Sequence, residues 1–275
     1  MDGSPRSGPV DMESIGGIWR IWHKAVTGST NVDALGGRPG DVFTADRQMS
    51  GRGRLNHRWL SPPGENLMMS AVIGVDGMPP EEVPTLPIVV GLAVARSVAE
   101  RLAVPLTREM ACGQDAGRCD RVKIKWPNDI LVDGRKVCGI LCERNGDCVI
   151  AGVGINVNQT VFAPEISDRA TSLRLELARC SGDCDVQPIS IPEVRDGTLA
   201  QLGAVLEVWR RSGFAGLWPD VSRLDFLKGR LVSVSRVDGD DNPSAGMCGG
   251  ILPDGALDVG GVAVYAGEAH VRRIV

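Results

Sequence analysis

The chain has few aromatic side chains and no excess of positive charge. Among its 275 residues, aromatic residues make up 4%, and the formal net charge is −4. A negative balance gives no overall field that attracts DNA, RNA or an anionic membrane. Few rings are available to stack on bases. We therefore expect any nucleotide or nucleic acid to be held by a local basic cluster.

The eight cysteines lack the spacing of a zinc site, because the sequence contains no C-x-x-C pair and only three histidines. Structural zinc sites in proteins are built from such closely spaced pairs. We expect no metal-binding residues and interpret the cysteines as reduced thiols of a cytoplasmic protein. Cys138 and Cys142 fall in a strand pattern, where a thiol packs as a small apolar group.

Long apolar runs and a secretory leader are also missing. Apolar stretches such as 86–95 are much shorter than the roughly 20 residues of a membrane span. The first residues are rich in Gly, Pro and Ser and include acids, unlike a signal or transit peptide. We expect no membrane association and a disordered leader over residues 1–16.

Apolar periodicity predicts alternating strands and helices in one larger domain, 17–224. In the segment 86–102, valine and leucine recur at a spacing of four, which indicates a helix. Ser190 and Glu193 form a capping box that opens a second helix, ended by Gly213. The expected strands are 17–26, 42–45 and 67–75, and a short helix capped by Ser29 or Thr30 runs to Leu35.

Turn signals divide the second half of the chain. Asp133-Gly134 and Asn145-Gly146 are two-residue hairpin turns, so 122–157 is predicted to be an antiparallel meander. The segment 107–121 reads as a polar insertion or long loop. Many turns and short strands follow Lys228, which indicates a small β-barrel domain over 225–275.

The first hairpin carries charged side chains where a buried strand is expected. With a two-residue turn, Leu131 faces Lys136 and Asp129 faces Cys138, which puts all four side chains on one face of the sheet. A lysine and an aspartate on such a face need a partner, which is either each other or a ligand. Gly139 in mid-strand favours the ligand, because glycine allows close approach.

A second constellation places arginines between glycines, in Gly51-Arg52-Gly53-Arg54. Glycines make such a loop deformable, and guanidinium groups match carboxylate and phosphate oxygens in pairs. By composition alone, the loop could contact nucleic acid or simply be solvated. The later stretch 152–156, G-V-G-I-N, lacks the final glycine and the helix of a dinucleotide fingerprint, and by itself indicates a bulged strand end.

In their order and spacing, these pieces resemble the biotin protein ligases. The resemblance spans about residues 18–173, with weaker motifs from Leu227 onward. It is carried by Ser29-Thr30-Asn31, Gln48 ahead of the G-R-G-R loop, Trp59, K-W-P-N-D from Lys125, R-K-x-x-G-I-L-x-E from Arg135, and G-x-G-I-N from Gly152.

The resemblance implies an α+β fold. Its main part would be a mixed, mostly antiparallel sheet flanked by helices, the class II synthetase-like catalytic fold of biotin and lipoate ligases. A small SH3-like β-barrel would follow at the C-terminus. The residues that precede the expected first strand leave no room for the helix-turn-helix domain of the family's repressors, so we expect no DNA binding.

The implied activity is a two-step ligation. Biotin would attack the α-phosphate of Mg²⁺-ATP to give biotinyl-5′-AMP, and the acyl group would then pass to a lysine on the biotin-carrier domain of a carboxylase. Mg²⁺ would arrive with ATP rather than in a protein cage. The implied oligomeric state is a monomer or a weak homodimer.

The resemblance also implies roles for individual residues. Lys136, Arg54 and Asp129 would be catalytic. The implied biotin-binding set is Ser29, Thr30, Asn31, Gln48, Gly51, Arg52, Gly53, Arg54, Trp126, Lys136, Gly139 and Ile140. The implied ATP- and adenylate-binding set is Arg52, Arg54, Trp59, Asn128, Asp129, Lys136, Ile155 and Asn156.

The sequence differs from the family pattern at some positions, and two other functions are compatible with parts of it. The family loop usually has Gly and Arg where this chain has Asn56 and His57, which bears on how the loop opens and retains the adenylate. A lipoate or octanoate ligase shares the same fold, but the polar Ser29-Thr30-Asn31 cluster suits a ureido ring better than an alkyl chain. An RNA-binding module is a further alternative, but the negative net charge and the scarcity of aromatic residues argue against it.

Overall fold

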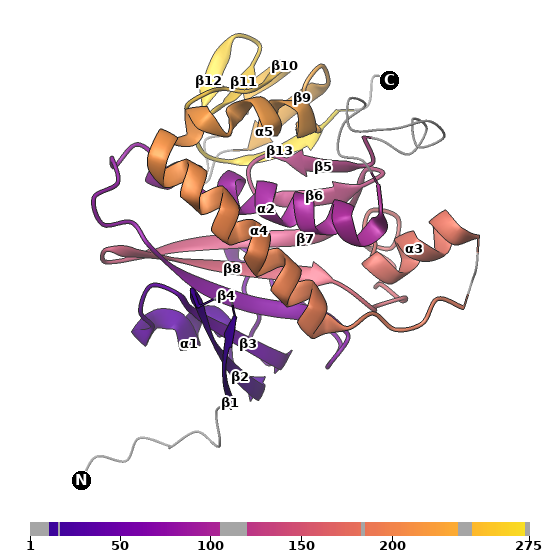
Figure 1. Ribbon diagram of the computed structural model, residues 1–275. Helices are drawn as coiled ribbons and strands as arrows, with labels where there is room; N and C mark the ends of the chain where they lie inside the picture. The colour runs from indigo at the N-terminus through magenta and orange to yellow at the C-terminus, as the bar shows by residue number, and fades with distance from the viewer. Residues whose placement is uncertain (1–10, 16, 105–119, 183–184, 236–243, 273–275) are drawn as a thin grey trace.

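The computed structural model describes residues 11–15, 17–104, 120–182, 185–235 and 244–272. Its main element is an eight-stranded sheet with the strand order β1-β2-β3-β4-β8-β7-β6-β5 (Figure 1). Strands β2 and β3 are parallel, and the other neighbours in the sheet are antiparallel. The strands are β1 (Asp11–Ile15), β2 (Trp19–Thr27), β3 (Asp41–Gln48), β4 (Asn66–Gly74), β5 (Val122–Lys125), β6 (Asp129–Val132), β7 (Arg135–Asn145) and β8 (Cys148–Asn156).

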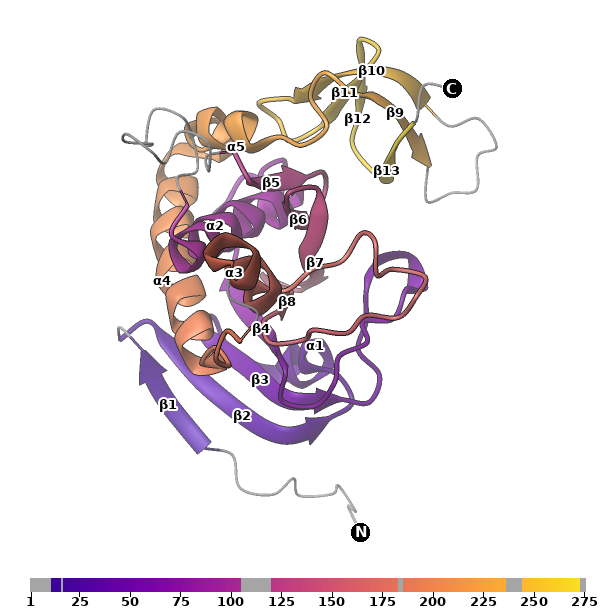
Figure 2. The same cartoon turned by 90° about the vertical axis from the view of Figure 1, so that its right-hand side faces the viewer.

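Two long helices, α2 (Leu86–Leu102) and α4 (Ile191–Ser212), cover one face of this sheet (Figure 2). Shorter helices complete the unit, and the first of them packs against the inner strands β3, β4 and β8. These helices are α1 (Thr30–Asp33), α3 (Leu173–Ser181) and α5 (Trp218–Leu224), with 3-10 turns η1 (Ala34–Gly36), η2 (Arg54–Asn56), η3 (Val83–Thr85) and η6 (Phe214–Gly216).

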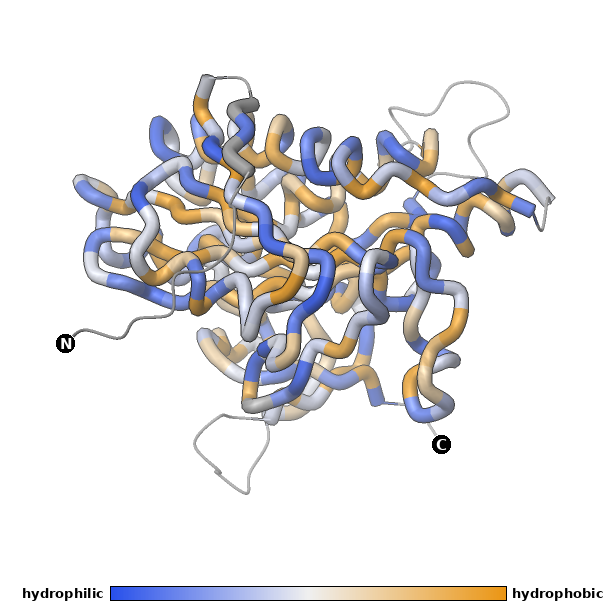
Figure 3. The backbone as a smooth tube through the Cα atoms, turned by 90° about the horizontal axis from the view of Figure 1, so that it is seen from below, coloured by the Kyte–Doolittle hydropathy of each residue, from blue (hydrophilic) through white to orange (hydrophobic). Residues whose placement is uncertain are grey.

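The core lies between the helices and the sheet, where hydrophobic segments gather (Figure 3). Gly91 of α2 brings the helix close to the strands, since a Cβ atom there would lie 3.5 Å from Ile130 and 3.7 Å from Ile140. The apolar side chains of β6 and β7 therefore point toward α2. The polar site residues of these strands are left to the opposite face.

A second, antiparallel sheet follows at the C-terminus, with the order β12-β11-β10-β9-β13. It packs onto the main unit through indole donors: Trp126 Nε1 donates to the Gly255 carbonyl at 3.1 Å, and Trp218 Nε1 to the Ile251 carbonyl at 2.7 Å. Its strands are β9 (Leu231–Ser235), β10 (Ser244–Ile251), β11 (Leu257–Val259), β12 (Val262–Val264) and β13 (Glu268–Val271).

The predicted helix 86–102 is confirmed as α2, and the second predicted helix, with Ser190 as its N-cap, is confirmed as α4; the Glu193 carboxylate pairs with Arg101. There the Ser190 hydroxyl accepts a hydrogen bond from the Glu193 backbone N–H, and Gly213 follows the last turn. The antiparallel meander over 122–157 is also confirmed, as β5 to β8. Ser29 occupies the N-cap position of α1, but its side chain makes no capping bond.

Three expectations need correction. Residues 11–15, predicted to belong to a disordered leader, form strand β1 on the edge of the sheet. The hairpin contains a bulge, so Asp129 pairs with Gly139 rather than with Cys138, although Leu131 does face Lys136. The helical segment 83–102 is long and apolar enough to span a membrane, but 72% of its apolar window is buried inside the protein. Most of the predicted insertion 107–121 lies outside the described residues.

Candidate active site

On one face of the main sheet, three glycines of neighbouring strands leave room for the Trp59 indole and the Asn31 amide to lie directly against the backbone. Gly139 of β7 lies opposite Gly154 of β8, and Gly152 lies one step along the same face. A Cβ atom at Gly154 would lie 2.5 Å from the Trp59 ring, and one at Gly152 would lie 2.2 Å from Asn31 Oδ1. No larger residue fits at either position without displacing the group above it. The glycines thus form a floor on the sheet face away from α2.

A buried polar cluster stands at one end of this floor. Gln48 Oε1 accepts hydrogen bonds from the Thr30 backbone N–H at 2.8 Å and from the Thr30 hydroxyl at 3.1 Å. The Ser70 hydroxyl lies 2.7 Å from Thr30 Oγ1 and 2.6 Å from Asn31 Oδ1. The buried Ser29 precedes these residues at the start of α1. A patch of hydroxyls and amides is therefore held at low exposure, where each hydrogen bond is geometrically fixed.

An ion pair stands at the other end of the floor. Lys136 Nζ lies 2.6 Å from Asp129 Oδ1, with side chains that are 37% and 17% exposed. The ammonium also lies 5.9 Å from the centre of the Trp59 ring. A lysine ammonium has three donors. Asp129 occupies one of them, so donors remain for an anion that approaches over Gly139.

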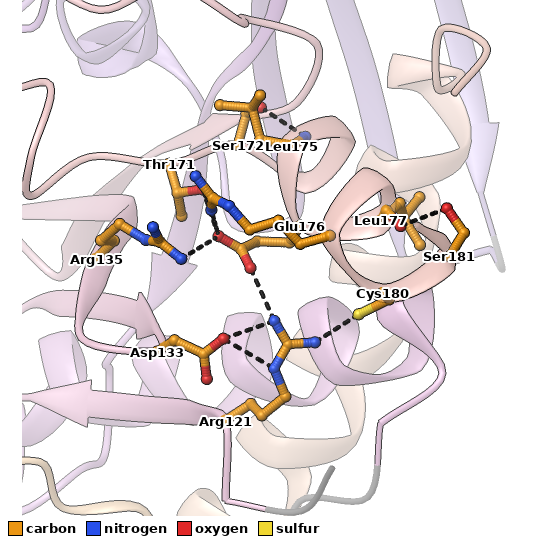
Figure 4. A network of polar contacts seen from close by, with 11 residues as sticks. Arg121, Asp133, Arg135, Thr171, Ser172, Leu175, Glu176, Leu177, Cys180 and Ser181 are labelled. Atoms are coloured by element: carbon orange, nitrogen blue, oxygen red, sulfur yellow. Dashed lines mark hydrogen bonds and ion pairs between the residues drawn. The ribbon is translucent and has the colours of Figure 1, made fainter. Parts of the chain in front are cut away.

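The strand that carries Lys136 is anchored from behind. The backbone N–H of Lys136 donates to the Arg169 carbonyl at 2.7 Å, and the carbonyl of Lys136 accepts from the Thr171 N–H at 2.9 Å. Thr171 in turn donates through its hydroxyl to Glu176, a fully buried carboxylate of α3. Three arginines surround Glu176 (Figure 4), namely Arg121, Arg135 and Arg179. A buried carboxylate needs such compensation, and the network fixes the start of β7.

The loop 51–58, called the arginine loop below, folds back on itself above the sheet. The Gly53 N–H donates to the His57 carbonyl at 2.7 Å, and the Trp59 N–H donates to the Gly51 carbonyl at 3.0 Å. A Cβ atom at Gly51 would lie 2.4 Å from the Trp59 carbonyl oxygen. Leu55 at the tip has φ 52°, a left-handed conformation that costs energy for a bulky residue. The arginine loop is therefore compact, and its backbone is strained at Leu55.

The side chain of Arg54 points from this loop to the nucleotide end of the predicted site. Its guanidinium lies 3.3 Å from Asn128 Oδ1. Burial lowers the pKa of Arg54, while the charges of Glu268 and Asp129 raise it. A guanidinium still stays protonated in a protein. Desolvation therefore leaves a cation that an incoming anion would stabilise.

Asn156 lies on the same face as Gly154, and its amide donates to the Thr171 carbonyl at 3.0 Å. The structure thus brings together the largest part of the predicted set. The residues that meet around the floor are Ser29, Thr30, Asn31, Gln48, Gly51, Arg52, Gly53, Arg54, Trp59, Asn128, Asp129, Lys136, Gly139 and Asn156.

Three predicted side chains point elsewhere. Trp126 is 2% exposed, and its indole N–H bonds to the connection between β10 and β11. Ile140 packs toward Gly91 of α2. Ile155 is fully buried in the core, on the opposite face from Gly154. Strand alternation turns Ile140 and Ile155 away from the floor. Trp126 lies in the turn between β5 and β6, and its hydrogen bond to Gly255 holds it against the second sheet.

Sequence reasoning missed two residues of the site, Ser70 and Glu143. Ser70 is a fully buried hydroxyl in β4, a strand whose other residues are mainly apolar. A polar residue in the middle of an otherwise apolar run is the available signal. Glu143 closes the R-K-x-x-G-I-L-x-E motif, and its carboxylate contacts both Asn31 and Arg52.

Within the described residues, no group of three or more His, Cys, Asp or Glu side chains is placed to hold a metal ion. The free cysteines Cys138, Cys142, Cys148, Cys180 and Cys248 are spread over both sheets and α3. Burial raises the pKa of the Cys138 thiol far above its usual range. It therefore packs as an uncharged group.

The comparisons with known proteins agree with this geometry. Residues 31–159 match the model of the biotin/lipoate A/B protein ligase family. The chain is 32% identical over 259 residues to the biotin–[acetyl-CoA-carboxylase] ligase of Mycobacterium tuberculosis (strain ATCC 25618 / H37Rv), a match that covers 90% of this chain and 88% of the relative. The chain belongs to the biotin protein ligase family.

Other members of the biotin protein ligase family match it in part or in fold. The bifunctional ligase/repressor BirA of Bacillus subtilis (strain 168) is 36% identical over 141 residues, but this covers only 38% of that protein. A solved structure of the biotin protein ligase from Aquifex aeolicus in complex with biotin and ATP superposes with a TM-score of 0.72. It is 26% identical, and the match covers 92% of this chain and 99% of that one. The expected α+β fold is thereby confirmed.

Proposed function

We propose that this protein activates biotin with ATP to biotinyl-5′-AMP and transfers the biotin to a lysine on the biotin-carrier domains of carboxylases. The observation that carries the proposal is Lys136, which stands with free donors over a floor of glycines. A polar cluster suited to a ureido ring lies at one end of the floor, and the desolvated Arg54 lies at the other. Membership in the biotin protein ligase family supports the same conclusion.

The first step brings two anions together, the biotin carboxylate and the α-phosphate. Lys136 would contact both, which offsets their repulsion and stabilises the charge that develops as pyrophosphate leaves. Asp129 holds the ammonium at 2.6 Å and so keeps it at the edge of the floor. The carboxylate oxygen attacks phosphorus, the bond to the pyrophosphate oxygen breaks, and a mixed anhydride results.

The biotin end of the floor would be the polar cluster. Ser29, Thr30, Asn31 and Gln48 would hydrogen-bond the ureido ring, with the buried Ser70 behind them. Gly139 would allow the apolar part of biotin to lie against the strand. Gly152, under Asn31, would keep the amide at the correct depth.

The nucleotide end would be formed by Asn128, Asp129 and Asn156, with Trp59 against the floor. The Trp59 indole Nε1 is buried without a hydrogen-bond partner among the described residues, so a ligand acceptor would reach it only if the ring moved. Magnesium would enter with the ATP phosphates, and Asp129 is the carboxylate placed to help hold it. No resident metal site is required.

Arg52 and Arg54 would act as a lid. A mixed anhydride is hydrolysed by water, so a loop that folds over the adenylate protects it until a carrier lysine arrives. Arg54 reaches Asn128 beneath the loop, and Arg52 reaches Glu143. In the second step, the carrier's amine attacks the acyl carbon and AMP leaves with the electron pair of the broken bond.

We further propose a cytoplasmic protein, monomeric or a weak homodimer, with no nucleic-acid or membrane partner. The free cysteines support a reducing compartment, and the net charge of −4 gives no attraction to nucleic acid. The apolar helix 83–102 is mainly buried and supports a core role. A lipoate or octanoate ligase is the second candidate, but the relatives reported above are biotin ligases.

Pyrophosphate exchange into ATP tests the function directly. We expect exchange that depends on biotin, is weak with lipoate or octanoate, and is absent without an acid. Exchange with lipoate but not with biotin would identify the second candidate. Absence of exchange with every acid would contradict the adenylation activity itself.

Lys136→Ala should reduce biotin-dependent exchange by about 100-fold or more, because a preorganised cation is removed from the developing charge. Thermal unfolding should change little, since the side chain is 37% exposed. The control is Lys123→Ala, which removes a lysine that pairs with Asp120 outside the site. Equal exchange rates for both variants would rule out a catalytic role for Lys136.

Gly152→Ala should raise the KM for biotin at least about ten-fold, because the added methyl group displaces the Asn31 amide. The matched control is Gly197→Ala in α4, where the nearest atom would lie 3.6 Å away. Gly197→Ala should keep the wild-type KM and gain roughly 0.5–1 kcal/mol of stability. A normal biotin KM in Gly152→Ala would place the ureido ring elsewhere.

A further inference from the structure

Glu143 lies where the polar cluster meets the arginine loop. On β7, Glu143 follows Gly139 and Leu141 at steps of two, so its side chain points to the face of the floor. Its Oε2 accepts from Asn31 Nδ2 at 2.8 Å, and its Oε1 lies 2.9 Å from an Arg52 guanidinium nitrogen. One carboxylate therefore joins a residue of the predicted biotin pocket to a residue of the predicted lid.

The contact with Asn31 determines which way the amide of that residue faces. A carboxylate can only accept hydrogen bonds, so the NH₂ group of Asn31 must point to Glu143. The Leu141 carbonyl, 3.4 Å from the same nitrogen, reinforces this orientation. Asn31 Oδ1 is then directed to Ser70 above Gly152. A carbonyl oxygen has two lone pairs, so Oδ1 can accept a second hydrogen bond from a ligand N–H.

We propose that Glu143 is a positioning residue that orients the Asn31 amide as an acceptor and tethers Arg52, so that the ring pocket and the lid are coupled. The proposal rests on the function proposed above and concerns how the same site is organised. Each carboxylate oxygen has its own partner. The two effects can therefore be separated, because only the tether to Arg52 needs the negative charge.

Two substitutions at position 143 separate the two effects. Glu143→Gln keeps an oxygen for Asn31 but presents an NH₂ group to Arg52, so it breaks only the tether. Its KM for biotin should stay within about two-fold of wild type, while free biotinyl-adenylate should leave about two to five times faster, as expected for a half-exposed ion pair. Glu143→Ala also leaves the buried Asn31 amide with only its longer bond to the Leu141 carbonyl, and should raise the KM for biotin about ten-fold.

A double-mutant cycle tests the tether. Arg52→Gln should release the adenylate as fast as Glu143→Gln does, and the double variant should be no faster than either single variant. The matched control is Arg58→Gln in the same loop, an exposed arginine whose guanidinium lies 3.5 Å from the Met49 carbonyl. Its effect should add to that of Glu143→Gln, because the two residues share no contact.

The outcomes distinguish this proposal from the proposed function. Additive effects of Glu143→Gln and Arg52→Gln, or a biotin KM in Glu143→Gln as high as in Glu143→Ala, would overturn the positioning role while wild-type exchange still depended on biotin. Lack of biotin-dependent exchange in the wild type would overturn both proposals. Thermal unfolding of each variant verifies that it is folded.

Discussion

The ion pair between Lys136 and Asp129 is the interaction on which the site depends. It keeps a cation at the edge of the glycine floor, 5.9 Å from the centre of the Trp59 ring. Without the aspartate, the ammonium would be drawn to solvent. Without the glycines, side chains on the sheet would keep a ligand too far from the sheet for the Lys136 ammonium to contact it. The buried Glu176 network contributes from behind, because it fixes the first residues of the strand that carries the lysine.

The sequence was sufficient for elements whose signals are local. The period of α2, the N-cap at Ser190 and the hairpin turns of the meander each depend on neighbouring residues, and the structure contains all three. The pairing of Lys136 with Asp129 was one of two predicted alternatives, a mutual partner or a ligand. The structure contains the mutual pair, and the remaining donors of Lys136 allow a ligand to bind as well.

Directions of side chains were harder to predict, because they depend on register. The bulge between Ile130 and Leu131 shifts Asp129 from Cys138 to Gly139, and no turn signal announces it. Trp126 was assigned to the biotin pocket by its place in the motif, yet its indole N–H is satisfied by the Gly255 carbonyl, more than a hundred residues away. Glu143 is the last residue of the R-K-x-x-G-I-L-x-E motif, but its partners come from α1 and from the arginine loop, which are distant in the sequence.

The small C-terminal sheet also contributes to the electrostatics of the loop. Burial lowers the pKa of Arg54, and the charge of Glu268 in β13 partly offsets this effect. Glu268 also lies 3.9 Å from His57 Nε2. The loop therefore lies between the glycine floor and a carboxylate of the second sheet. The side chains of His57 and Glu268 are 72% and 37% exposed, so this contact should stabilise the loop only weakly.

The most direct measurement is a crystal structure with biotinyl-5′-AMP bound. We expect the conjugate to bind above Gly139, Gly152 and Gly154, with the ureido ring at the polar cluster. Lys136 Nζ should lie within hydrogen-bond distance of the acyl-phosphate oxygens. A conjugate bound elsewhere on the protein, with Lys136 directed into solvent, would show that Lys136 and the glycine floor do not form the adenylation site.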